Sequence, residues 1–280
     1  MSGAGVAGAG VAGAGVSGAG VSGAGVAGAA VAVVTTGIPA SASASASAVP
    51  PIVPAVRSAL RSAGDPERAV GQQRYMKSAL PYHGLTSSDL RGLLRPLLAD
   101  PGLAPATRGE WESAVRALWD GVEYREEWYA AIALTGHRAA RAWQDPDALG
   151  LYRHLVETGA WWDVVDAVAA DRVGPILLSH RPVVTPAMRA DAVDGHLWVR
   201  RTAILAQLKH RSATDVGLLE DVLDANLEDS RFGREFFIRK AVGWALRQYA
   251  RTDPEWVRGY VGSRGARLSG LSRREALKHL

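Results

Sequence analysis

The charged residues of this chain begin abruptly and so limit which part of it can fold. No Asp, Glu, Lys, Arg or His occurs before Arg57, and all 32 basic and 28 acidic residues follow that point. The remaining stretch of about 224 residues is long enough to enclose one sizeable apolar core. We therefore predict a single domain over residues 51–280, preceded by a tail over residues 1–50.

The tail is a low-complexity sequence. Residues 3–32 repeat Gly-Ala-Gly-Val followed by Ala or Ser, five times and then once imperfectly, and Ser alternates with Ala from Ala40 to Ala48. Glycine loses much entropy on ordering and these side chains bury little area, so we expect disorder. The absence of a basic leader and the short apolar run argue against a signal peptide or a membrane span. A wrongly chosen translation start would also explain the repeat.

The charge of the chain is unevenly distributed. Residues 57–230 carry 20 basic and 24 acidic groups, whereas residues 231–280 carry 12 basic and 4 acidic groups. A cationic C-terminal fifth is typical of a surface that contacts phosphates, because neutralising them releases condensed counterions. A solvated helix face that only keeps the protein soluble remains an open alternative.

Helix-start signals recur from residue 51 onward. An N-cap Asp or Thr followed by Pro is found at 65–66, 145–146, 185–186 and 253–254, and capping boxes fit Thr107-x-x-Glu110 and Ser272-x-x-Glu275. Apolar residues between them recur at helical spacing, and no convincing period-two run occurs. We predict an all-α fold of stacked antiparallel helical pairs, a HEAT-like solenoid with a concave face that holds ligands.

Several classes of catalytic site have no support. The phosphate-loop, nucleophile-elbow and zinc-protease motifs are missing, and the seven His are scattered without ligand spacing. A metal site on Asp163 and Asp166 would need more carboxylates nearby, so we expect no metal and no other cofactor. The chain has no Cys, which fits a reducing cytoplasm, and we expect a cytoplasmic, nucleoid-associated monomer without membrane contact.

One short stretch combines aromatic and acidic residues on a predicted helix. In residues 161–166, Trp-Trp-Asp-Val-Val-Asp, the helical period places Trp162 and Asp166 on one face. Trp161, Val164 and Val165, with Val168, spread around the other side and are expected in the core. Trp162 and Asp166 could share one face because of helix packing, or because they form a functional site. Trp198 and Trp244 could likewise be core residues, and Arg201 an ion-paired surface group.

Five blocks in order resemble the AlkD-type DNA alkylation repair glycosylases. They are Tyr-Met-Lys at 75–77, Ala-Trp-Trp-Asp-Val-Val-Asp at 160–166, Trp-Val-Arg-Arg-Thr-Ala-Ile at 198–204, Phe-Phe-Ile-Arg-Lys-Ala-Val-Gly-Trp-Ala-Leu-Arg-Gln-Tyr-Ala at 236–250 and Leu-Ser-Arg-Arg-Glu-Ala-Leu-Lys-His at 271–279. The resemblance runs from about Pro66 to the C-terminus. The first 50 residues have no counterpart in it.

The resemblance implies a HEAT-like solenoid that binds duplex DNA and removes N3- or N7-alkylated purines. It implies Asp166 as the catalytic carboxylate, Trp162 and Trp244 as aromatic walls, Arg201 as the cation near the phosphate, and Tyr75 as a contact to lesion-bearing DNA. Further DNA contacts are expected from the basic residues of the matching C-terminal blocks, Arg239, Lys240, Arg247 and Arg273. The loop over 229–234 is longer than the usual pattern, which changes the local DNA contact expected there.

The chemistry suits these residue types. An alkylated purine is cationic and leaves readily, so the electron deficit of the reaction develops on the sugar, which becomes an oxocarbenium ion. A fixed carboxylate can stabilise this cation and orient the attacking water. Indole faces attract positive charge, and Arg holds a phosphate. Two alternatives remain open: a HEAT-like protein that recognises distorted duplex DNA without catalysis, and a generic protein-binding solenoid.

Overall fold

The computed structural model describes residues 49–280, and this part of the chain is helical throughout, with no β-strand. The α-helices are α1 (Ile52–Ser62), α2 (Pro66–Met76), α3 (Ser87–Ala99), α4 (Arg108–Asp120), α5 (Arg125–Thr135), α6 (Leu149–Gly159), α7 (Trp162–Val168), α8 (Gly174–Ser179), α9 (Arg181–Asp191), α10 (Leu197–Leu205), α11 (Val216–Asp224), α12 (Phe236–Tyr249), α13 (Pro254–Arg264) and α14 (Gly270–Ala276). The Gly/Ala repeat and the predicted disorder of the tail lie outside the described residues. No helix within residues 49–280 has the length and apolarity needed to cross a membrane.

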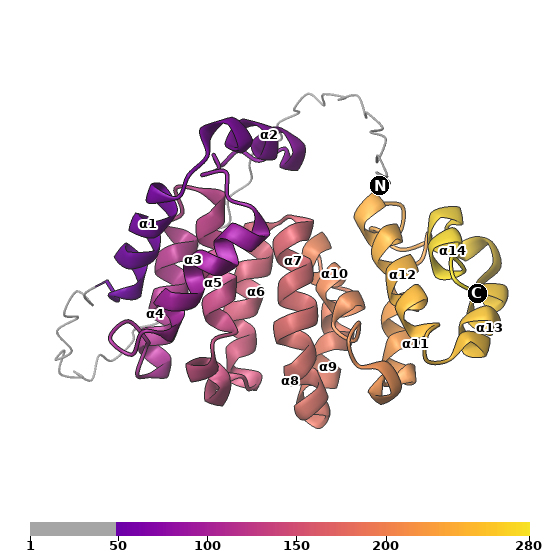
Figure 1. Ribbon diagram of the computed structural model, residues 1–280. Coiled ribbons are helices and arrows are strands. Elements are labelled where there is room, and N and C mark those ends of the chain that lie inside the picture. Colours follow the sequence, from indigo (N-terminus) through magenta and orange to yellow (C-terminus); the bar gives the residue numbers. More distant parts are fainter. Residues whose placement is uncertain (1–48) are drawn as a thin grey trace, which may run out of the picture. The chain divides into compact units, whose positions relative to one another are not determined.

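The helices of residues 49–280 stack in two layers (Figure 1). In one layer α3, α5, α7, α10, α12 and α14 each contact the next along the series. In the other layer α4, α6, α9 and α13 each pair with their sequence neighbour in the first layer, and α11 contacts both α9 and α10. This stacking confirms the predicted all-α helical-repeat solenoid. The layer that runs through α7, α10 and α12 carries most of the predicted site residues.

Local capping explains where several helices begin. The side chains of Asp65, Asp253 and Thr107 accept hydrogen bonds from backbone N–H groups in the first turns of α2, α13 and α4, at 3.0, 2.9 and 3.2 Å. These N-caps were predicted from sequence. Asp145 likewise caps a short 3₁₀ helix at Pro146–Ala148.

Two predicted helix starts are wrong. Pro186 lies inside α9, which begins five residues earlier at Arg181, so Thr185 is not an N-cap. The cap of α14 is Ser269, whose Oγ accepts from the Ser272 backbone N–H at 2.9 Å. Glu275 therefore does not close a capping box with Ser272. Its carboxylate instead binds two basic side chains of α12, which are described below.

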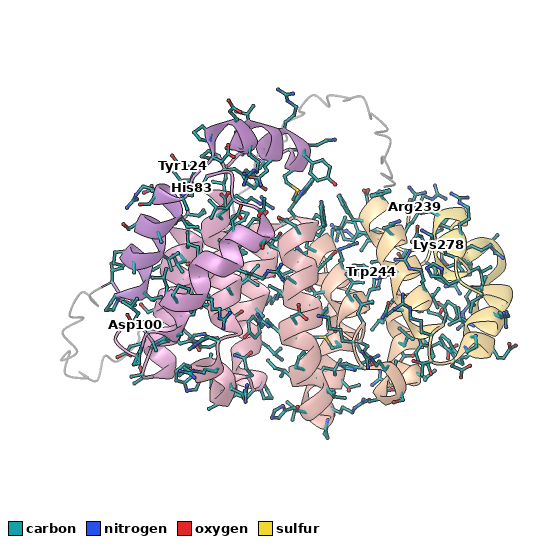
Figure 2. The ribbon with its side chains drawn as sticks, in the orientation of Figure 1. His83, Asp100, Tyr124, Arg239, Trp244 and Lys278 are labelled. Atoms are coloured by element: carbon teal, nitrogen blue, oxygen red, sulfur yellow. The ribbon has the colours of Figure 1, made fainter. Side chains whose placement is uncertain are left out.

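A buried carboxylate anchors the loop that follows α2. Glu126 of α5 accepts hydrogen bonds from the backbone N–H groups of His83, Gly84 and Leu85, at 2.9, 2.9 and 3.2 Å. The ring of His83 stacks on Tyr124, with centroids 3.8 Å apart, and the two residues lie together beneath α2 (Figure 2). These contacts fix the loop that returns from α2, the helix that carries Tyr75.

Candidate active site

The site is built around α7, which is held rigidly by its apolar side. Val164, Val165 and Val168 are almost completely buried, as the sequence predicted. Trp161, at the N-cap of α7, packs against Trp198 and Phe237 with ring centroids 6.1 and 5.4 Å away. These contacts tie α7 to α10 and α12, so the polar side of α7 has a fixed position between its neighbours.

The backbone of α7 continues without a break into a π-helical turn, Ala169–Val173, and then into α8. The π turn carries Asp171, which lines the same pocket as Asp166. Such turns occur frequently at functional sites, because the extra residue re-aims the side chains that follow. No signal in the sequence predicted this turn.

Asp166 is held by a guanidinium from the neighbouring helix. Arg201 of α10 donates from Nε to Oδ1 at 2.7 Å and from Nη2 to Oδ2 at 2.8 Å, while its Nη1 donates to the Phe237 carbonyl oxygen. The Arg201 side chain is only 4% exposed and that of Asp166 is 15% exposed. A bidentate pair of this kind fixes the orientation of the carboxylate as well as its charge.

The electrostatics of Asp166 reflect two opposing influences. Burial raises the pKa of the Asp166 carboxyl above its ordinary value, because the charged form loses hydration. The hydrogen bonds and positive charge of Arg201 oppose this rise, and the nearby Asp163 adds to it. The carboxylate is therefore a less hydrated anion than an exposed aspartate, and it interacts more strongly with any positive charge placed beside it.

Asp166 opens onto a pocket of about 350 Å³, which we call the Asp166 pocket. Trp244 of α12 lines the same pocket, together with Ala167, Asp171, Lys209 and Gln248. In the view of Figure 2, Trp244 lies on α12 below Arg239, on the side nearer α10. The structure thus brings an aromatic ring and the predicted catalytic carboxylate together at one surface.

Trp162 and Tyr75 line a second, larger hollow beside this pocket. The hollow also includes Asp163, and it shares Ala167 and Asp171 with the Asp166 pocket. Tyr75 is 77% exposed, which is unusual for an aromatic side chain. The two predicted aromatic walls, Trp162 and Trp244, therefore border adjoining hollows with α7 between them.

Arg201 is held inside the protein by its hydrogen-bond partners. Its side chain is almost fully buried, and three of its nitrogens donate to Asp166 and to the Phe237 carbonyl oxygen. In this arrangement Arg201 orients the Asp166 carboxylate. The contact with a DNA phosphate that the sequence predicts for Arg201 stays a prediction.

Most of the basic residues expected to contact DNA already have hydrogen-bond partners within the protein. Lys240 and Arg247 both donate to Glu275 of α14, and the distance from Lys240 Nζ to Glu275 Oε1 is 2.7 Å. Burial raises the pKa of Glu275, but these two cations outweigh it and leave the pKa below its ordinary value. Arg273 donates to the Gly265 carbonyl oxygen at 2.7 Å, and Arg239 has a buried Nε without a hydrogen-bond partner in the described structure. Part of the C-terminal positive charge thus holds α14 against α12.

Asp163, the other carboxylate of α7, belongs to a separate network. It accepts from Arg125 Nη2 and from the Tyr129 hydroxyl, both at 2.6 Å. The sequence could not indicate Arg125 and Tyr129 as its partners, because they lie more than thirty residues earlier. Among residues 49–280 no three His, Cys, Asp or Glu side chains cluster as metal ligands would.

A family model described as DNA alkylation repair enzyme matches residues 56–280. The chain belongs to the DNA alkylation repair enzyme family. Among solved structures it is similar to a predicted DNA alkylation repair enzyme from Enterococcus faecalis, with a TM-score of 0.65 and 28% sequence identity over 78% of this chain and 96% of that one. No curated protein sequence matches the chain.

Membership of the DNA alkylation repair enzyme family gives the chain a role in the repair of alkylated DNA. The matched residues include α7, α10 and α12, and so the Asp166 pocket lies within the part of the chain that the family shares. The polar groups at that pocket are therefore the first candidates for the chemistry of repair.

Proposed function

We propose that this member of the family is a DNA glycosylase that hydrolyses the N-glycosidic bond of N3- or N7-alkylated purines in duplex DNA. The observation that carries the proposal is the orientation of Asp166, which Arg201 holds by two hydrogen bonds at the edge of a pocket shared with Trp244. A fixed carboxylate beside an aromatic face suits a reaction that develops positive charge.

The leaving group needs little help from the protein. Alkylation at N3 or N7 makes the purine cationic, and the electron pair of the breaking glycosidic bond neutralises that charge as the base departs. A general acid is therefore unnecessary. The barrier lies at C1′ of the sugar, which becomes an oxocarbenium ion.

Asp166 is suited to stabilise that cation and to orient the water that attacks C1′. An ionised carboxylate has about four acceptor positions, and Arg201 occupies two of them. The remaining positions can accept a hydrogen bond from water and face the positive sugar. The water oxygen bonds to C1′, its proton passes to solvent or to Asp166, and an abasic sugar and the free purine remain.

The two tryptophans supply a partly dry, electron-rich border. Trp244 lies at the Asp166 pocket and Trp162 at the adjoining hollow, so a sugar beside Asp166 would have an indole on each side. An aromatic face attracts a cation within about 6 Å, more strongly when water is excluded. Tyr75, exposed at the far side of the Trp162 hollow, is positioned for contact with the DNA that carries the lesion.

One observation favours a second candidate, a protein that binds damaged duplex without cleaving it. Arg201 already balances the charge of Asp166, and this could make the pair structural rather than catalytic. The two functions differ in what the carboxylate does. Binding to alkylated DNA would survive the replacement of Asp166 by Asn in both cases. Base release by the wild type, lost in that variant, is expected only if Asp166 acts in catalysis.

Base release from methylated duplex DNA tests the proposal. The purified protein is incubated with DNA that contains 7-methylguanine and 3-methyladenine, and the released bases are separated by chromatography. We expect release by the wild type and a large loss with Asp166→Asn, with DNA binding retained. Binding of the methylated duplex without release by the wild type would support the non-catalytic function instead.

A further inference from the structure

A second pocket lies next to the Asp166 pocket, and the proposed reaction does not use it. Its volume is about 330 Å³, and we call it the Arg251 pocket. It shares Leu208 and Gln248 with the Asp166 pocket, so the two pockets adjoin. Its apolar floor includes Ile204 and Leu219.

Two exposed arginines border the Arg251 pocket, Arg211 after α10 and Arg251 after α12. Over residues 49–280 no carboxylate lies within ion-pair distance of either guanidinium. Two other arginines of the C-terminal region do form ion pairs: Arg247 pairs with Glu275, and Arg264 pairs with Glu220 and Asp224. Unpaired guanidiniums at the mouth of a pocket are suited to bind an anion.

Lys209 lines the Asp166 pocket but not the Arg251 pocket. Its side chain is 64% exposed, and it pairs with Asp171 at the surface. Arg201, by contrast, is buried. The exposed cation beside Asp166 is therefore Lys209, and Arg211 follows two residues later.

The backbone holds Arg211 in an unusual conformation. Its φ is +53°, in the left-handed region that residues with a side chain rarely adopt. The loop around it is pinned by Gln207, whose side chain donates to the Asp215 carbonyl oxygen at 3.0 Å and accepts from the Asp215 N–H at 2.8 Å. Strained residues of this kind persist where surrounding contacts fix them, often at ligand sites. In this conformation Arg211 lines the Arg251 pocket.

We infer that Lys209, Arg211 and Arg251 form a track of cations that binds successive phosphates of the DNA strand leading away from Asp166. The inference rests on the proposed function, because it takes DNA as the ligand of the Asp166 pocket. Phosphodiesters are the anions that a repair enzyme must hold in register, and three cations along two adjoining pockets match a chain of phosphates better than a single small anion.

The test is the binding of a fluorescent undamaged duplex by anisotropy over a range of salt concentrations. The variants are Lys209→Gln, Arg211→Gln and Arg251→Gln, and the control is Arg258→Gln on α13, where the arginine is also exposed but lines neither pocket. Each track variant is expected to bind several-fold more weakly at low salt. The slope of log affinity against log salt should become shallower by about 0.9 for each phosphate that the variant no longer neutralises. The control should match the wild type.

The outcomes separate this inference from the function on which it rests. Unchanged affinity and salt slope in all three track variants, with base release by the wild type intact, would overturn the track alone. Weakened binding in the variants without base release by the wild type would keep the track and overturn the glycosylase. Adenosine monophosphate provides a further check. If it bound the wild type but not Arg251→Gln while duplex affinity stayed the same, the pocket would be a mononucleotide site and the inference would be wrong.

Discussion

Arg201 donates to both oxygens of Asp166 from a position that is almost completely buried. Removing one partner of a buried pair leaves the other charge without compensation, which typically costs about 3–5 kcal/mol. Arg201→Met should therefore lower the free energy of unfolding by about that amount and abolish base release. A phosphate contact at the surface would cost far less stability.

Chemical denaturation checks this expectation, with Arg189→Met as the control. Arg189 pairs with Asp221 in an exposed ion pair, and such pairs contribute about 0.2–1 kcal/mol. The double variant Arg201→Met/Asp166→Asn should recover part of the lost stability, because it removes the stranded carboxylate. Equal, small losses for Arg201→Met and Arg189→Met would contradict the assigned role of Arg201.

The raised pKa of Asp166 predicts how base release varies with pH. Only the ionised carboxylate can stabilise the sugar cation, and burial shifts its protonation to higher pH than the ordinary value of about 3.9. The rate should accordingly be constant near neutral pH and fall as the pH is lowered, with its midpoint above that value. Single-turnover rates at saturating protein, with folding followed by circular dichroism, give the profile. A rate that rises on acidification would indicate a general acid instead.

Trp244→Ala should slow base release without unfolding the protein, because Trp244 is only partly buried and borders the Asp166 pocket. A desolvated cation–π contact contributes about 2 kcal/mol, which corresponds to about a 30-fold loss of rate. The control is Trp256→Ala on α13, where the ring stacks on Tyr260 with centroids 5.2 Å apart. Single-turnover rates that fall equally in both variants would show that Trp244 has no special part in the reaction.

Gly243 is required for the close approach of α14 to α12. A Cβ at this position would lie 2.6 Å from the Glu275 Cβ and 2.9 Å from the Ser272 carbonyl oxygen. Gly243→Ala should thus destabilise the protein by about 1–3 kcal/mol through overpacking. Gly262→Ala on α13, where a Cβ has open space, should instead stabilise it by about 0.5–1 kcal/mol. Thermal unfolding distinguishes the two, and a stabilising Gly243→Ala would contradict the observed packing.

What the sequence predicted was mostly local. N-caps such as Asp65 and Asp253 act within one turn of their helix, so spacing alone identifies them. The helical period also predicts Trp162 and Asp166 on one side of α7; in the structure Trp162 lines the larger hollow and Asp166 the pocket beside it. The all-α fold could be predicted because many such local signals agree.

What the sequence left open depends on residues far apart in the chain. Arg201 lies 35 residues from Asp166, and nothing local indicates that its guanidinium turns inward to a carboxylate. Glu275 has the spacing of a capping box, but its two partners on α12 compete successfully for the carboxylate. The adjoining pockets beside Lys209 and Arg251 arise only when α10 and α12 pack together.

The two carboxylates of α7 allow the most direct test of the proposed mechanism. Asp166 faces the pocket shared with Trp244, whereas Asp163 lies about 60° around the helix and accepts from Arg125 and Tyr129. The measurement is the single-turnover release of 7-methylguanine from duplex DNA by wild type, Asp166→Asn and Asp163→Asn, each at the same concentration of folded protein.

We predict that Asp166→Asn loses at least about a hundredfold in rate, in line with the loss of one charge-stabilising group. Asp163→Asn should lower the stability but keep the rate within about tenfold of the wild type, because its carboxylate accepts hydrogen bonds from Arg125 and Tyr129 within the protein. A rate for Asp166→Asn equal to that of the wild type would contradict the central claim that Asp166 carries the reaction.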